Sequence, residues 1–200
     1  MVGCRRATLG FVGYMNFRTR GRDKERGATL IEMALILPML LVILIGTLEV
    51  GAAFRDYLTT SHAVRDGVRL LSAKGDDPEA DCSALLAAVD TMTLSGRFEN
   101  LVSIEIYQAD SDGDQIPSKT NTYTFTTGDP EDCDDWDGYP GVNYPPNSRF
   151  VLAGGTTPLD IIGMRITYTH PWMTQVPPFT GIITIDETTI SRIEPEGFET

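Results

Sequence analysis

The sequence has few of the residues that catalytic sites most often use. Its 200 residues include two histidines, three cysteines and two tryptophans. His62 falls in a predicted helix and His170 precedes Pro171 at the end of a predicted strand, so we expect neither to have a partner that orients it as a general base. The sequence also lacks a nucleophile elbow, a phosphate-binding loop and a zinc-ligand cluster. We therefore expect the protein not to be an enzyme and to need no cofactor.

Positive charge is scarce after the first 27 residues. Residues 1–27 contain seven basic and two acidic residues, a net charge of +5, whereas the whole chain carries −12 and the remainder therefore −17. Basic residues that flank an apolar span are retained in the cytoplasm, which predicts a cytoplasmic N-terminus and an extracytoplasmic C-terminal domain. The acidic remainder lacks the basic surface that nucleic acids require, and this argues against a nucleic-acid partner.

A long apolar run extends from Ala28 to Phe54, with Glu32, Pro38, Gly46, Thr47 and Glu49 as its main interruptions. About 20 helical residues cross the hydrocarbon core of a bilayer. A buried helix of a soluble protein would be amphipathic rather than apolar all round. The run therefore predicts one transmembrane helix in the cell membrane, with the lipid bilayer as a partner.

The segment Arg26-Gly27-Ala28-Thr29-Leu30-Ile31-Glu32 resembles the processing site of type IV pilins. It is more similar still to that of the TadE-like pseudopilins of tight-adherence (Flp) pilus systems. The likeness continues through Leu37-Pro38 and 46–51, and more weakly in 160–170 and 191–195. In these families a prepilin peptidase cuts after the glycine, and the fifth mature residue is glutamate. The resemblance therefore implies cleavage between Gly27 and Ala28. Glu32 would then be the glutamate at the fifth mature position.

This resemblance implies a minor pilin or pseudopilin that acts in assembly of a tight-adherence pilus or a related secretion apparatus. Its implied partners are a prepilin peptidase, other pilins or pseudopilins, and an inner-membrane assembly platform. Cleavage would leave an ammonium group on Ala28 beside the Glu32 carboxylate, and opposite charges attract strongly in low dielectric. Alternatively, Glu32 lies at the membrane interface, where a carboxylate costs little.

Two other functions remain open from the sequence. The chain could be an unprocessed, membrane-anchored extracellular binding module, with calcium as a candidate ligand. Ordinary signal peptidase could instead cut after Gly51-Ala52-Ala53 and release a soluble domain that begins at Phe54. The apolar run is longer than the roughly 7–15 residues of a secretory signal, which disfavours release.

Beyond the span, the sequence predicts an α+β fold: a long N-terminal transmembrane and stalk helix over about 28–73, a short second helix over about 78–92, and an antiparallel β-sheet packed on the stalk. The period-two patterns predict strands near 102–107 and 123–125, joined by a loop over 109–119, and further strands at 149–153, 160–170 and 181–193. The expected organisation is a leader over 1–27, a span over 28–54, its helical continuation over 55–75 and an acidic domain over 76–200.

One face of that continuation is expected to pack on the sheet or on the stalk of another subunit. The residues at helical spacing on this face are Phe54, Tyr57, Leu58, Val64, Val68 and Leu71. Charged residues are expected on the opposite face, namely Arg55, Asp56, Arg65, Asp66 and Arg69.

Two further features concern the outer domain. If the leader is removed, Cys82 and Cys133 are the cysteines that remain; in an oxidising compartment one disulfide is the economical interpretation, and two separate thiols the alternative. The long loop that contains Cys133, over 128–147, either presents Trp136, Tyr139 and Tyr144 as a contact surface or tucks these aromatics beneath it.

A short acidic motif, Asp110-Ser-Asp112-Gly-Asp114, resembles the opening of a calcium-binding loop. Gln115 and Asn121 occupy positions where such loops have Gly and a bidentate Glu. An acidic hairpin turn is therefore the alternative to a calcium site.

Overall fold

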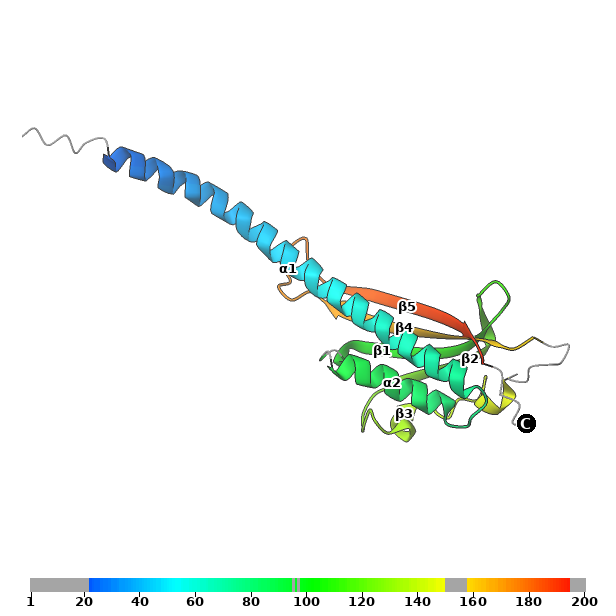
Figure 1. Cartoon of the computed structure of the whole chain (residues 1–200). Helices are drawn as coiled ribbons and strands as arrows, with labels where there is room; N and C mark the ends of the chain where they lie inside the picture. The colour runs from blue at the N-terminus through cyan, green and yellow to red at the C-terminus, as the bar shows by residue number, and fades with distance from the viewer. Residues whose placement is uncertain (1–21, 95, 97, 150–157, 195–200) are drawn as a thin grey trace, which may run out of the picture. The chain divides into compact units, whose positions relative to one another are not determined.

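The computed structural model describes residues 22–94, 96, 98–149 and 158–194. The chain divides into two compact units, one that ends at Leu44 and one that begins at Ile45. Figure 1 shows the helices and strands with their labels. Helix α1, Arg22–Lys74, belongs to both units, and every later element belongs to the second. These are helix α2, Ala80–Leu94, and strands β1, Leu101–Ala109, β2, Gln115–Phe125, β3, Trp136–Asp137, β4, Ile161–Pro171, and β5, Ile182–Arg192.

In the first unit, the apolar part of α1 has its side chains exposed. From Leu30 to Leu44, each large apolar side chain retains about half or more of its surface, for example 74% for Leu35 and 47% for Leu41. Of the helices in the described ranges, α1 is the one that is long and apolar enough to cross a membrane. Pro38 lies inside it without ending it. This is the behaviour expected of a segment whose solvent is lipid.

The second unit is built on a five-stranded antiparallel sheet with the order β3-β2-β1-β4-β5. Strands β1 and β4 form its centre, where Ile104 pairs with Ile166 and Ile106 with Met164. Strand β5 pairs with β4 along its whole length, from Pro171 opposite Ile182 to Ile161 opposite Arg192. The predicted α+β fold, with a sheet packed on the long helix, is therefore confirmed.

Both helices contribute to one hydrophobic core with this sheet. The core includes Val64, Val68 and Leu71 of α1, Leu85 and Met92 of α2, and Ile104, Ile106, Met164 and Ile166 of the sheet. Gly67 of α1 lies against Met164 of β4. A Cβ there would lie 2.3 Å from the Met164 sulfur, so the packing leaves no room for a side chain without movement of Met164.

Helix ends follow their local signals. Gly75, at φ +56°, donates its backbone N–H to the Leu71 carbonyl and ends α1, as the predicted Lys74-Gly75 stop requires. The Asp77 carboxylate accepts the backbone N–H of Glu79 at 2.8 Å, just before α2 begins.

Three predictions need correction or fall outside the described residues. The loop expected over 109–119 is shorter, because β2 already begins at Gln115; a register irregularity opposite Tyr107 and Ala109 accommodates Pro117 within the strand. The strand expected at 149–153 falls almost wholly outside the described residues. The third correction concerns the face of α1 that packs on the domain, and it is described below.

Candidate sites for processing, assembly and anchoring

The predicted cleavage site lies within helix α1. Gly27 is partly buried, Ala28 is exposed, and the helix continues through both residues. A Cβ built on Gly27 would meet no atom within 4 Å. Packing within the described chain therefore gives no reason for a glycine at this position. A peptidase that accepts only a small residue before the cut would require a glycine here. This geometry is compatible with such a requirement.

Glu32 is exposed on the same helix, between the exposed Ile31 and Met33. It follows Ala28 by four residues, so the two side chains lie on one face, about 6 Å apart along the helix axis. A carboxylate among lipid-exposed apolar side chains is costly unless it is neutralised or paired. An amine at Ala28 would be close enough to pair with it within one chain, and an exposed carboxylate is also accessible to the amine of a neighbouring chain.

A second carboxylate on α1, Glu49, is used inside the folded unit. It is 1% exposed, and its two oxygens accept the backbone N–H groups of Met173 and Thr174 at 2.9 and 2.6 Å. Met173 and Thr174 belong to the turn between β4 and β5. Glu49 therefore holds this turn against α1. This role explains why a charged residue lies at the end of the apolar run.

A third acidic residue, Asp56, lies two helical turns beyond Glu49 on the same face and is also buried. Its Oδ2 is 2.7 Å from Nδ1 of His170, at the end of β4, and both side chains are at most 1% exposed. The sequence-based expectation that His170 has no orienting partner is therefore wrong. Because both groups are buried, this contact holds β4 against α1.

These contacts correct the predicted faces of α1 between residues 54 and 58. Phe54, Tyr57 and Leu58 were expected to pack on the sheet or on the stalk of another subunit; they are 59%, 42% and 40% exposed, so the sheet does not cover them. Asp56 was expected on the charged face and is buried. The expectation holds for Val64, Val68 and Leu71, which are in the core. Together with Val50, which is 56% exposed, these side chains form an exposed apolar stripe on α1: Val50, Phe54, Tyr57 and Leu58.

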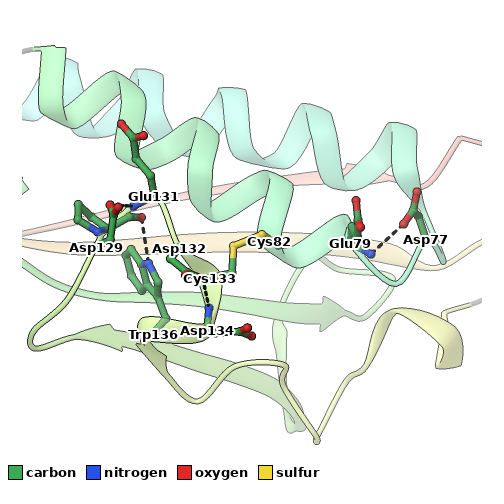
Figure 2. Close-up of a disulfide and its surroundings, with 10 residues drawn as sticks. Asp77, Glu79, Cys82, Asp129, Glu131, Asp132, Cys133, Asp134 and Trp136 are labelled. Carbon is green, nitrogen blue, oxygen red and sulfur yellow. Dashed lines mark hydrogen bonds between the residues drawn. A yellow bond between two sulfur atoms is a disulfide. The ribbon is translucent and has the colours of Figure 1, made fainter.

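The predicted disulfide is present in the outer part of the second unit. Cys82 of α2 is bonded to Cys133, with 5.6 Å between their Cα atoms and 51 residues between them in sequence (Figure 2). Trp136 and Tyr144 of the same long loop are 2% and 1% exposed, and Trp136 donates its indole N–H to the Pro130 carbonyl at 3.2 Å. These two aromatics are tucked beneath the loop, so the contact-surface alternative is wrong for them.

A buried polar network also holds this loop. Asp81, in the first turn of α2, forms an ion pair with Arg149, and both side chains are at most 1% exposed. Tyr123 donates its hydroxyl to Asp81 at 2.5 Å, and Asn121 donates its amide to Asp81 at 3.2 Å and to the Tyr144 carbonyl at 2.9 Å. Burial and the adjacent Asp81 charge raise the pKa of Tyr123 above its ordinary value. No local pattern in the sequence indicates this network, since its members are far apart in the chain.

The acidic motif at Asp110, Asp112 and Asp114 forms the β1–β2 turn. One Asp110 oxygen accepts the backbone N–H groups of both Asp112 and Asp114 at 2.9 Å. Within the described ranges, no three His, Cys, Asp or Glu side chains are grouped closely enough to hold a metal ion. The hydrogen bonds are those of a hairpin turn, and the calcium site stays an untested prediction.

Residues 27–69 match the family model described as TadE-like protein. The match begins at Gly27 and covers α1 as far as Arg69, so it includes the apolar segment and most of the stretch that packs on the sheet. It supports the resemblance seen in the sequence. The comparisons with curated proteins and with solved structures gave no match.

Proposed function

We propose, from the match of residues 27–69 to the TadE-like family, that this chain is a TadE-like pseudopilin that acts in assembly of a tight-adherence pilus or a related secretion apparatus. The observation that carries the proposal is where the match begins. It starts at Gly27, where the chain changes from a basic leader to an apolar helix and where a prepilin peptidase is expected to cut. The proposed partners are this peptidase, other pilins or pseudopilins and an inner-membrane platform.

The proposed topology has the leader in the cytoplasm and the α+β unit outside the membrane. The leader has a net charge of +5, and basic flanks favour the cytoplasmic side. The Cys82–Cys133 disulfide supports this orientation, because disulfides persist in oxidising compartments and are rare in the cytosol.

Removal of the leader would give Glu32 its function. The new ammonium on Ala28 and the Glu32 carboxylate would neutralise each other in the bilayer, within one chain or between two chains. A pair between two chains would fix the axial register of two helices, because each charge can be satisfied only at one offset. The resulting helix–helix contact is a means of adding the subunit to a filament or to its base.

The exposed apolar stripe supports an assembly role from a different part of α1. Val50, Phe54, Tyr57 and Leu58 recur at three- and four-residue spacing, and the domain of the same chain does not cover them. Helices that pack in pairs use such stripes. We propose that this stripe is buried against the helix of another pilin subunit.

The cleavage site can be tested by intact mass and N-terminal sequencing of protein extracted from native membranes. The pseudopilin proposal requires a chain that begins at Ala28. A chain that begins at Phe54 would instead indicate ordinary secretion, and one that keeps Met1 would indicate an unprocessed anchor.

Two matched glycine variants sharpen this test. Gly27→Leu should block trimming, whereas Gly51→Leu should not. A Cβ at either glycine would meet no atom within 4 Å, so neither substitution disturbs the packing of the chain itself. The opposite pattern, with trimming blocked by Gly51→Leu alone, would rule out cleavage after Gly27.

The role of Glu32 requires a separate measurement. Glu32→Gln should leave cleavage and membrane insertion intact but should prevent co-purification with the other pilins and reduce pilus formation. Glu99→Gln, at an exposed position of the outer unit, is the matched control and should change neither. Normal assembly of the Glu32→Gln protein would contradict the proposed charge pair.

A further inference from the structure

The turn between β4 and β5, residues 172–181, forms with Ile182, the first residue of β5, an uncharged and largely apolar segment in a chain that is strongly acidic. From Ile166 to Ile185 the sequence contains no Asp, Glu, Lys or Arg. Three large apolar side chains of this segment are exposed: Met173 at 71%, Val176 at 49% and Ile182 at 67%. Exposed apolar residues that are clustered and free of charge mark surfaces that contact another apolar phase or partner.

The turn lies beside the part of α1 where the membrane span is expected to end. Glu49 holds the turn through the backbone of Met173 and Thr174. A Cβ on Gly46 would lie 3.3 Å from the Phe179 ring, which shows that this aromatic side chain packs directly on the helix. A bilayer core takes about 20 helical residues, which, counted from Ala28, end near Thr47. The turn therefore lies at the level of α1 where the hydrocarbon core gives way to headgroups.

The backbone of the turn satisfies many of its own polar groups. The Gln175 side chain donates to the Trp172 carbonyl at 2.8 Å and accepts the N–H of Gly181 at 3.1 Å, and Phe179 donates its N–H to the Val176 carbonyl at 2.7 Å. Internal pairing of this kind lowers the cost of moving a turn into a less polar medium. Trp172 stacks edge-on with Phe179, with 5.0 Å between ring centroids, and such aromatic side chains favour the membrane interface.

We propose that the β4–β5 turn is a second membrane anchor, which inserts Met173, Val176 and Ile182 into the boundary between headgroups and acyl chains of the outer leaflet. The turn would thereby fix the tilt and rotation of the α+β unit on the bilayer. The occupant is lipid rather than a second subunit, because the turn contains no charged residue and packs on α1 at Gly46 and Glu49, beside the expected end of the membrane span. The proposal depends on insertion of α1 in a membrane and is independent of a role in pilus assembly.

Fluorescence quenching by lipids tests this proposal on the full chain. The protein is reconstituted at one copy per phosphatidylcholine nanodisc, with bromine placed near the headgroup end of the acyl chains. In the brominated nanodisc, the wild-type protein should lose the part of its fluorescence that comes from Trp172. The emission of the reconstituted protein should also lie at shorter wavelength than that of the unfolded protein in solution without detergent. In Trp172→Phe the remaining emission comes from Trp136, which is buried in the outer unit and should not respond to the brominated lipid.

A charged variant separates insertion from mere proximity. Met173→Asp combined with Val176→Asp changes two exposed side chains and should abolish the quenching by lipid, while aqueous iodide should now quench Trp172. Unchanged quenching by lipid in this variant would show that the turn is only near the bilayer and would overturn the proposal. Quenching by iodide in the wild type would overturn it as well. The proposal would also be overturned if Trp172 were protected from iodide only in nanodiscs that hold two copies of the protein, since that result would indicate packing between subunits.

Discussion

Replacement of Arg149 by methionine should destabilise the second unit far more than a comparable change at an exposed residue of that unit. Arg149 and Asp81 form an ion pair in which both side chains are at most 1% exposed, and Arg149 also donates to the Tyr144 carbonyl at 3.3 Å. Removal of one partner of a buried pair leaves an uncompensated charge and typically costs about 3–5 kcal/mol. Asp81 would keep its hydrogen bonds from Tyr123 and Asn121. We therefore expect the low end, about 3 kcal/mol, in the free energy of unfolding.

Urea unfolding of the full chain in detergent micelles, with the disulfide intact, measures this difference by intrinsic tryptophan fluorescence. The matched control is Arg165→Met, which breaks the ion pair of Arg165 with Glu105 at 3.3 Å. Those side chains are 37% and 24% exposed, and solvent screening limits such a pair to less than about 1 kcal/mol.

A double variant tests whether the pair acts as a unit. Asp81→Asn combined with Arg149→Met should cost clearly less than the sum of the two single changes, because each single change leaves a buried charge that the double change removes. Equal costs for Arg149→Met and Arg165→Met would refute the claim that burial of the pair governs the stability of the loop.

Three further measurements test other contacts of the second unit. Substitution of both Cys82 and Cys133 by alanine should lower the free energy of unfolding by about 4 kcal/mol in the chain-entropy model for a loop of this length, measured by urea titration. Gly138→Ala should cost about 2 kcal/mol or more, because φ is +96° and the new Cβ would lie 2.2 Å from a backbone carbonyl of β2; Gly96→Ala, where space is open, should cost less. Because the pKa of Tyr123 is raised in the folded state, its contribution to stability is complete below about pH 10, the unfolded pKa, and falls as pH rises beyond it. Phenolate absorbance should show its ionisation coinciding with alkaline unfolding.

The sequence predicted elements whose signals are local. The apolar run, the Lys74-Gly75 stop and the alternation of Ile104 and Ile106 each lie within a few residues, and the structure confirms the helix and the strand that they predicted. The disulfide was predictable because few cysteines were available to pair. The strand order was not predictable, because β1 pairs with both β2 and the much later β4, and such pairing depends on contacts between distant segments.

The error on α1 has a specific physical cause. Patterns of polarity place acidic residues outside, because a buried carboxylate without partners is costly. Glu49 has two backbone N–H donors and Asp56 has His170, so both carboxylates are buried with partners. These partners come from β4 and from the turn that follows it, more than one hundred residues later in the chain. No local pattern could have indicated them.

The choice of face on α1 also bears on assembly. Full burial of an apolar side chain contributes about 1.5–3 kcal/mol, so a fold that packed Phe54, Tyr57 and Leu58 on its own sheet would gain several kcal/mol from these three residues. The chain instead buries Glu49 and Asp56 on its own domain and leaves the three apolar side chains exposed. If the subunit assembles as proposed, this burial would be gained in the assembled state. A helix of another subunit on this stripe would recover the apolar burial, and the two buried carboxylates hold β4 and the turn that follows it from a different face of α1.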